Sequence, residues 1–337
     1  MKKIEKYHVS EIKPGMKLGK DIVKNEIVLY PKDNVITEKV INFIKNWGIE
    51  EVYVQREDEN VIQNRERKEL KVKHRYQKAV ERTTKFMEGL KQKGRLDIKE
   101  VNELAEDLYK FSTDHYLFIK LMDQLQGKNS YLLQHSVNVG LFSSLLARWL
   151  RMDEAQIKEV GLTGLLHDIG RIYIRRKELK EFMEHPYYGY DIITKKTSYG
   201  DNIAKGVYQH HERADGSGYP RSLKSKAICS YAKIIAVVDT FDEYILAANM
   251  EKKCAFKAIE IIKESAFDKL DPLSAFTFGD RMLDLLVGAK VVLNDEKVGE
   301  VVMVNREKPT YSLVKVGDEF IDLSKETSLK ISEVLAF

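Results

Sequence analysis

Apolar residues recur at helical spacing through the middle of the chain, from residue 128 to residue 268. In the first run Val139, Phe142 and Leu146 fall on one face, because side chains three or four residues apart meet on the same side of a helix. The runs with such a face are 131–150, 160–174, 232–246 and 253–266. The pattern predicts a mainly α-helical unit in this part of the chain.

The first 55 residues have a different pattern. Short apolar stretches between residues 9 and 28 are broken by Gly and Pro, which is typical of strands joined by turns. An apolar stripe then predicts a helix from Thr37 to Gly48, and residues 52–54 predict a final strand. We therefore expect residues 1–55 to form a small α+β accessory domain.

The last 50 residues favour β-structure. Two apolar runs within 291–304, separated by a polar turn, predict a hairpin, and 311–316 and 319–323 predict two further strands. We therefore expect a small C-terminal β module over 286–337, which follows a helical domain at 128–285. The predicted fold class is mainly α, with the two small modules at its ends.

Residues 56–127 connect the N-terminal domain to the helical domain. From Arg56 to Arg95 there are 13 Lys or Arg against 7 Asp or Glu, in a pattern of helical character. Such a surplus could attract an anionic nucleotide or membrane, but a solvated helical connector is the commoner meaning of a charge run. We interpret 56–127 as a charged helical connector.

Composition excludes several classes of protein. A net charge of +4 over 337 residues does not indicate a DNA partner, and no apolar run approaches the roughly 20 residues that span a bilayer. The N-terminal residues contain no hydrophobic signal core. Two cysteines, Cys229 and Cys254, fit a reducing compartment better than a disulfide framework. We expect a cytoplasmic protein.

Histidines and acids interrupt the helical section in an unusual way. Five of the eight histidines lie there, and Asp168 and Asp239 each break a very apolar run. A lone buried His is ordinarily a satisfied core residue, but an ionised carboxylate in an apolar helix is costly unless it is paired or binds a cation. The candidate metal ligands are His135, His167, Asp168, His185, His210, His211 and Asp239.

These seven residues are too many for one ion and suit two ions that share a bridge. Asp168, beside His167, is the natural bridge because a carboxylate can offer one oxygen to each metal. Imidazole and carboxylate ligands without thiolate suit iron, manganese, zinc or cobalt. Two ions about 3.5–4 Å apart activate water for attack at phosphorus, so the residues predict a dinuclear phosphoester hydrolase.

The histidine pair is followed by a glycine-rich turn that brings Tyr219 and Pro220 close to it. By itself this is equally well explained as a loop with two polar residues. The motifs of the helical section are His135, His167-Asp168-Ile169-Gly170, His185-Pro186-x-x-Gly189, His210-His211-Glu212-Arg213-x-x-Asp215-Gly216-x-Gly218-Tyr219-Pro220 and Asp239-x-Phe241-Asp242. Together, over about residues 130–265, they resemble the HD-GYP family, bacterial signalling phosphodiesterases of the HD superfamily that hydrolyse cyclic diguanylate.

The resemblance implies an HD-type helical bundle and the same seven metal ligands. It also implies a bound pair of divalent ions, iron or manganese, and attack by a bridging hydroxide that gives linear diguanylate or GMP. A homodimer is favoured by analogy, with the connector helix as a surface for it. The N-terminal and C-terminal modules look like accessory regions that could bind a regulatory protein.

The chain departs from the family pattern at four places. Tyr131 stands where some members have a glutamate for a third metal, so two metals are expected. Arg171 replaces a usual Lys, and an arginine holds a phosphate but cannot release a proton near neutral pH. The segment from His167 to His185 is short, so part of a lid is expected to be missing, and 243–251 contain no Arg to grip a phosphate.

We therefore predict Asp168 and Arg171 as catalytic residues, and Arg171, Tyr219 and Arg221 as substrate contacts. For Arg221, a solvated loop residue is an equally good interpretation. The altered phosphate contacts leave two alternatives to an active cyclic diguanylate phosphodiesterase. One is a catalytically weak scaffold that senses cyclic dinucleotides, and the other is a hydrolase of a different cyclic dinucleotide.

Overall fold

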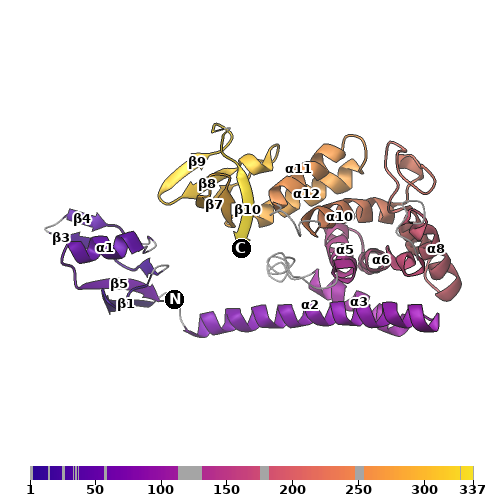
Figure 1. Ribbon diagram of the computed structural model, residues 1–337, viewed down its shortest axis with the longest axis horizontal. Coiled ribbons are helices and arrows are strands. Elements are labelled where there is room, and N and C mark those ends of the chain that lie inside the picture. Colours follow the sequence, from indigo (N-terminus) through magenta and orange to yellow (C-terminus); the bar gives the residue numbers. More distant parts are fainter. Residues whose placement is uncertain are drawn as a thin grey trace. The chain divides into compact units, whose positions relative to one another are not determined.

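The computed structural model divides the chain into two compact units, Met1–Lys71 and Val72–Phe337 (Figure 1). The described residues are 3–13, 16–24, 27–32, 34, 36, 38–56, 59–112, 131–174, 182–246, 254–326 and 328–336. Four predicted features lie wholly or partly outside them: the helix cap Thr37, the end of the connector at 113–127, most of the short segment before His185, and 247–251 of the segment without Arg.

The first unit combines a small sheet, a hairpin and one helix. Its antiparallel sheet has the order β1-β5-β2, with β1 at Lys3–His8, β2 at Lys17–Leu18 and β5 at Glu51–Arg56. The hairpin pairs β3 (Ile22–Lys24) with β4 (Ile27–Tyr30), and the helix is α1 (Glu38–Asn46). Leu18, Ile36 and Ile44 are fully buried at its core. The predicted helix and final strand are confirmed.

Helix α2 (Glu59–Lys93) follows, and its 35 residues begin in the first unit and end in the second. One face packs into the core of the second unit through Val72, Tyr76, Ala79, Phe86, Met87 and Leu90. Helix α3 (Ile98–Phe111) starts at the cap Asp97, whose carboxylate accepts the N–H of Glu100. Arg82 of α2 joins the two helices through an ion pair with Asp107 at 2.7 Å.

Within the described residues, seven more α-helices belong to the second unit. They are α5 (Tyr131–Trp149), α6 (Glu154–Leu166), α8 (His185–Lys196), α9 (Asp201–Gln209), α10 (Ser230–Leu246), α11 (Ala255–Ser265) and α12 (Pro272–Leu285). The five from α5 to α10 carry the clustered histidines and acids. The backbones of helices α5 and α6 are in close contact at glycine residues. A Cβ on Gly164 would lie only 2.8 Å from the backbone oxygen of Val139. The absence of side chains there lets the two backbones touch.

The predicted helix at 160–174 is wrong at both ends. Helix α6 begins at Glu154, after a capping box formed by Asp153 and Gln156, and it ends at Leu166. A separate 3-10 helix, η1, spans Ile169–Tyr173. The helical path is interrupted between Leu166 and Ile169. Gly170, within η1, packs against the start of α8, since a Cβ there would lie 2.0 Å from the backbone oxygen of His185. The break places His167 and Asp168 at a helix end.

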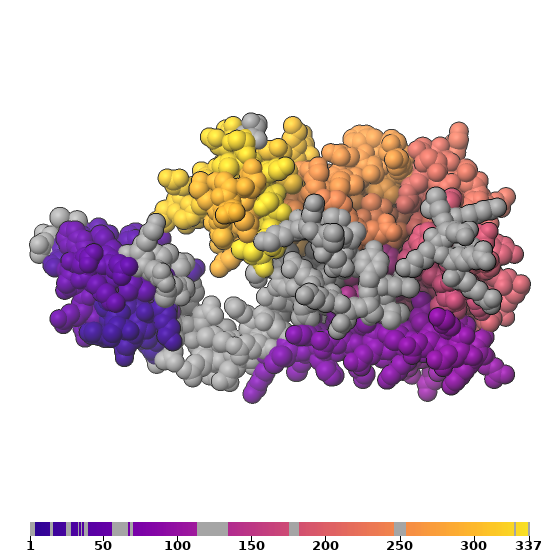
Figure 2. Space-filling view, in the orientation of Figure 1, coloured from indigo at the N-terminus to yellow at the C-terminus, as the bar shows by residue number. Residues whose placement is uncertain are grey.

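A five-stranded antiparallel sheet completes the second unit, in the order β10-β6-β7-β8-β9. The strands are β6 (Lys290–Leu293), β7 (Val298–Met303), β8 (Leu313–Val316), β9 (Glu319–Asp322) and β10 (Ile331–Ala336). Its buried side chains belong to the same apolar cluster as the helices, and Figure 2 shows the yellow sheet against the orange atoms of α11 and α12. The predicted hairpin and strands are confirmed, and β10 was not predicted.

The fold class is mainly α, as predicted, with small sheets near both ends of the chain. Among the helices of the described ranges, none combines the length and the apolar character that a membrane crossing requires.

The contact between α5 and α6 generates a stability prediction. The variant Gly164→Ala places a Cβ against the backbone of Val139 and Gly140, which cannot yield as a flexible side chain can. We expect a loss of about 1–3 kcal/mol in the free energy of unfolding, the usual cost of overpacking. Urea denaturation followed by circular dichroism measures it.

The matched control is Gly89→Ala in α2, where a Cβ would meet nothing within 4 Å. It should keep or raise stability, since alanine favours a helix interior over glycine by about 1 kcal/mol. Equal effects of the two variants would contradict the close backbone packing of α5 and α6.

Candidate metal centre

The seven predicted ligands lie together in the second unit, and all seven side chains are buried. They come from five helices: α5, the end of α6, the start of α8, the end of α9 and the middle of α10. Their ligand atoms form two groups, in each of which the atoms lie within 4.8 Å of one another. The first group is His135, His167 and Asp239, and the second is Asp168, His185, His210 and His211.

Three histidines are oriented by the same local contact. The Nδ1 atoms of His167, His185 and His210 lie 2.6–2.7 Å from the carbonyl oxygens three residues earlier. A carbonyl only accepts, so each Nδ1 carries the hydrogen and donates. When the ring is neutral, each Nε2 carries a lone pair that points into the cluster, which is the form that binds a metal.

The lone pairs of His185 and His210 face each other. Their Nε2 atoms are 3.1 Å apart, although neither can donate in the neutral form described above. Burial and the neighbouring His211 hold the pKa of His210 well below its usual range, so this ring is neutral. Two acceptors at this distance repel each other unless a cation lies against them.

Asp168 lies between the two groups. Its Oδ1 is 3.1 Å from Nε2 of His185, and its Oδ2 is 3.4 Å from Nε2 of His167. One oxygen therefore faces each group. Burial disfavours the ionised form, but His167 and Arg171 outweigh it and hold the pKa of Asp168 well below its usual range.

The buried carboxylates have no hydrogen bonds of their own. In the described part of the chain, none of the four oxygens of Asp168 and Asp239 accepts a hydrogen bond. Imidazole nitrogens lie as close as 3.1 Å and Nε of Arg171 lies 2.8 Å from Oδ1 of Asp168, but none is in hydrogen-bonding geometry. Buried ionised oxygens without hydrogen bonds are costly, and divalent cations with imidazole and carboxylate ligands satisfy them. The cluster fits divalent metal ions.

The loop after His211 covers one side of the cluster. Tyr219 stacks on the ring of His211, with 4.7 Å between ring centroids and 26° between planes. The loop is held by the buried carboxylate of Glu212, which accepts the backbone N–H groups of Arg221 and Leu223 at 2.7 and 2.8 Å. This role of Glu212 was not predicted from the sequence, although the residue directly follows the two histidines.

Known proteins give an independent comparison. Residues 120–273 match the family model of the HD domain. A cyclic di-GMP phosphodiesterase of Pseudomonas aeruginosa is 27% identical over 219 residues, which cover 61% of this chain and 52% of that protein. A 3'3'-cGAMP-specific phosphodiesterase of Vibrio cholerae is 29% identical over 183 residues, which cover 50% of this chain and 38% of that protein. The chain thus spans about half or less of these relatives.

A solved structure agrees in fold. An HDG"Y"P protein of Bdellovibrio bacteriovorus superposes with a TM-score of 0.52 over 83% of this chain and 99% of that one, at 15% identity. Residues 120–273 therefore contain an HD domain, and the fold is that of the Bdellovibrio bacteriovorus protein. In the Gly218-Tyr219-Pro220 string singled out in the sequence, the tyrosine is the residue that stacks on His211.

Of the predicted substrate contacts, Arg171 lies next to the cluster. Its Nε is 2.8 Å from Oδ1 of Asp168, and its guanidinium lies 4.6 Å from the ring centroid of Phe182. The side chain of Arg221 is exposed, and the contact that the structure records for this residue is through its backbone. Substrate contact by Arg221 therefore stays a prediction.

Two further acids near the metal cluster were not assigned a role from the sequence. Asp242 places Oδ2 2.8 Å from Nδ1 of His135, which corresponds to the carbonyl contact of the other histidines. Glu243 follows Asp239 by four residues on α10, so the two share a face of that helix. Although Glu243 is exposed, much of the protein lies near its carboxyl, and this partial burial together with Asp239 raises its pKa to about 7.

The cluster predicts that metal removal destabilises the helical unit. A chelator should lower the melting temperature, because it leaves the facing lone pairs and the two carboxylates uncompensated. At free metal about 100-fold above Kd, each site contributes about 2.7 kcal/mol to the free energy of unfolding. Differential scanning calorimetry with and without chelator measures the change.

The variant Asp168→Asn should show a much smaller change in melting temperature on chelation, since the shared ligand is weakened. Asp318→Asn, in the exposed turn between β8 and β9, is the matched control and should behave as wild type. A wild-type protein whose melting temperature ignores both metal and chelator would contradict the assignment.

Glu243 predicts a pH effect in metal-free protein. A carboxyl with a pKa of about 7 in the folded state, against 4.5 as its ordinary value, costs stability when it ionises. The cost is absent below about pH 4.5, where both states are protonated; it grows between pH 4.5 and 7 and is constant above. Glu243→Gln should therefore stabilise the metal-free protein more at about pH 8 than at about pH 5.

Urea denaturation of both proteins at the two pH values measures this difference. Bound divalent metal neutralises Asp239, so the difference between the two pH values should shrink when metal is present. The same gain at both pH values without metal would contradict the raised pKa.

Proposed function

We propose that this chain is a dinuclear metal-dependent phosphodiesterase that hydrolyses cyclic diguanylate to linear diguanylate or GMP. The observation that supports it most is the position of Asp168, whose two oxygens face two separate groups of ligands. A shared carboxylate of this kind suits two ions at the short spacing that phosphoester hydrolysis uses.

All seven clustered residues would hold the metal pair, with Asp168 as the bridging ligand. When bound, two divalent ions supply an activated water and stabilise negative charge on the attacking and leaving oxygens. The donors are nitrogen and oxygen atoms without thiolate, which suits iron, manganese, zinc or cobalt, and the resemblance to the HD-GYP family leads us to propose iron or manganese.

The residues around the cluster would bind and orient the substrate. Arg171 is a permanent cation beside Asp168, so its remaining N–H groups can hold a phosphate close to the metal ligands. Tyr219 presents an aromatic ring next to His211, where it can contact a guanine or shape the turn. Arg221, just after this turn, would add a second phosphate contact.

The choice of cyclic diguanylate follows the Pseudomonas aeruginosa relative, whose name states this substrate. The Vibrio cholerae relative is named for 3'3'-cGAMP, which differs in one base. Arg171 and the absence of Arg from 243–251 alter the phosphate contacts and favour a test of both nucleotides. They also keep a weakly active sensor of cyclic dinucleotides as the competing function.

We further propose a four-part organisation for this activity in the cytoplasm. The parts are an accessory domain at 1–55, a connector at 56–127, the HD-GYP catalytic domain at 128–285 and a β module at 286–337. The connector would support a homodimer, and the N-terminal or C-terminal module would bind a regulatory protein partner. No DNA partner is proposed.

The function is tested by metal content and turnover on one anaerobically purified sample. We expect two metals per chain and hydrolysis of cyclic diguanylate, separated by chromatography into linear and mononucleotide products. Asp168→Asn should lower turnover by at least about 10³-fold, because the shared ligand orients both ions. Asp318→Asn should not change it.

The outcomes separate the three functions. Faster hydrolysis of 3'3'-cGAMP than of cyclic diguanylate would replace the substrate and keep the reaction. Two metals with tight nucleotide binding but no turnover of either substrate would establish the sensor instead. A wild-type sample without metal would refute the whole proposal.

A further inference from the structure

His135 differs from three other ligands in how its ring is oriented. In His167, His185 and His210, Nδ1 contacts a carbonyl of the same short segment. Nδ1 of His135 instead contacts the carboxylate of Asp242 on α10, at 2.8 Å. The orientation of His135 therefore depends on a side chain that has its own partners.

Asp242 is the second member of a chain of buried hydrogen bonds. Its Oδ1 lies 2.9 Å from Nδ2 of Asn138 on α5, and Oδ1 of Asn138 lies 2.7 Å from the hydroxyl of Tyr76 on α2. The exposed fractions of Tyr76, Asn138 and Asp242 are 6%, 1% and 0%. These hydrogen bonds therefore connect α2 to the first metal group through buried side chains.

The hydrogen bonds run in one direction along these residues. The amide NH2 of Asn138 donates to Asp242, and the amide oxygen of Asn138 accepts from Tyr76. The Tyr76 hydroxyl is then the donor, and burial raises the pKa of this tyrosine, which keeps it protonated. At the other end Nδ1 of His135 faces Asp242, and its Nε2 faces Asp239 and His167.

We propose that Tyr76 is a positioning residue for the metal ligand His135, through which the seating of helix α2 sets metal affinity at the site of His135, His167 and Asp239. The inference rests on the metal centre and not on the identity of the nucleotide. Helix α2 begins at Glu59 within the N-terminal unit, so a movement of that helix would reach a metal ligand through three hydrogen bonds.

The test is Tyr76→Phe, which removes one hydroxyl and keeps the ring that packs in the core. The metal-free full chain is titrated with Mn²⁺ by calorimetry. One of the two binding steps should be weakened by about tenfold, which is the lower end of the effect seen for direct partners of a metal-bound histidine. The other step should not change, because the second group takes no part in this chain of hydrogen bonds.

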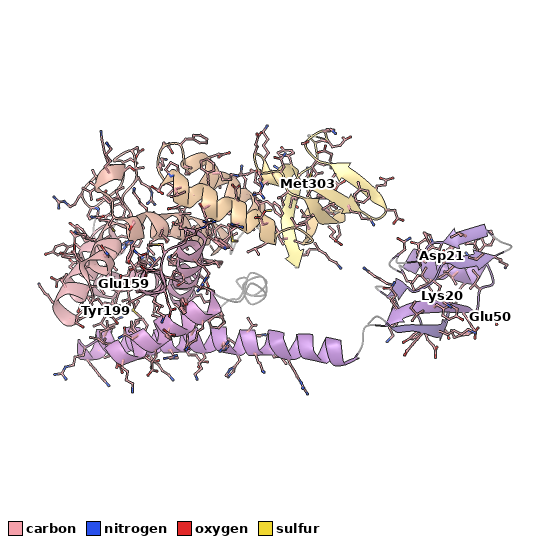
Figure 3. The ribbon with its side chains drawn as sticks, turned by 180° about the vertical axis from the view of Figure 1, so that it is seen from behind. Lys20, Asp21, Glu50, Glu159, Tyr199 and Met303 are labelled. Carbon is pink, nitrogen blue, oxygen red and sulfur yellow. The ribbon has the colours of Figure 1, made fainter. Side chains whose placement is uncertain are left out.

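Two other tyrosines provide matched controls. The hydroxyl of Tyr231 donates to Glu159 at 2.7 Å, and that of Tyr199 donates to the amide oxygen of Asn102 at 2.8 Å (Figure 3 labels Glu159 and Tyr199). Tyr231→Phe and Tyr199→Phe remove comparable hydrogen bonds that do not lead to a ligand. Both should bind Mn²⁺ as wild type does, even if they lower the melting temperature.

A double-mutant cycle tests whether the hydrogen bonds from Tyr76 to His135 act as one unit. Tyr76→Phe and Asn138→Ala should be non-additive in their effects on Mn²⁺ affinity, since either change breaks the same path to His135. Additive effects would overturn the proposal, as would unchanged affinity at both steps in Tyr76→Phe.

Hydrogen–deuterium exchange tests the link to α2 without any measure of activity. Coupling is reciprocal, so Mn²⁺ should slow amide exchange at residues 72–80 in wild-type protein and slow it less in Tyr76→Phe. Protection of 72–80 that is equal in both proteins, or absent from wild type, would overturn the role of α2. A wild-type protein that binds Mn²⁺ in both steps but does not hydrolyse cyclic diguanylate would instead count against the proposed function.

Discussion

Asp168 is a fully buried carboxylate that stays ionised at the meeting point of several helices, and its position constrains the rest of the second unit. An ionised group out of water costs several kcal/mol unless opposite charge surrounds it. In this chain Arg171 lies 2.8 Å from one oxygen of Asp168, and the other groups close to the carboxylate are imidazoles, whose Nε2 lone pairs repel one another when the rings are neutral and no cation is present. The helices are thus arranged around a cation-binding cluster that their own side chains neutralise only in part.

The backbone geometry follows from this requirement. Helix α6 stops at Leu166 so that His167 and Asp168 lie at its end, and the break is possible because Gly170 lets the chain touch α8. Carbonyl contacts at Nδ1 orient three of the histidines locally, whereas His135 depends on Asp242 and on α5 and α2 beyond it. One side of the cluster therefore depends on tertiary packing more than the other does.

The sequence predicted the parts of this arrangement that depend on local chemistry. All seven clustered residues could be named because buried acids in apolar helices are rare and the histidines near them follow a specific motif. The end of α6 could not be predicted, since the apolar period continues through Leu165 and Ile169 while the break depends on a contact with α8. Tyr76 was missed because it lies 62 residues from Asn138 and no local pattern joins them.

The central claim is that two metal ions lie on either side of Asp168 and share it. Crystals grown with Mn²⁺ and measured at the manganese absorption edge test it most directly, because anomalous scattering locates each ion independently of the chemistry. The account predicts two peaks about 3.5–4 Å apart, each next to a different oxygen of Asp168. A single peak, or two peaks of which neither touches Asp168, would contradict it.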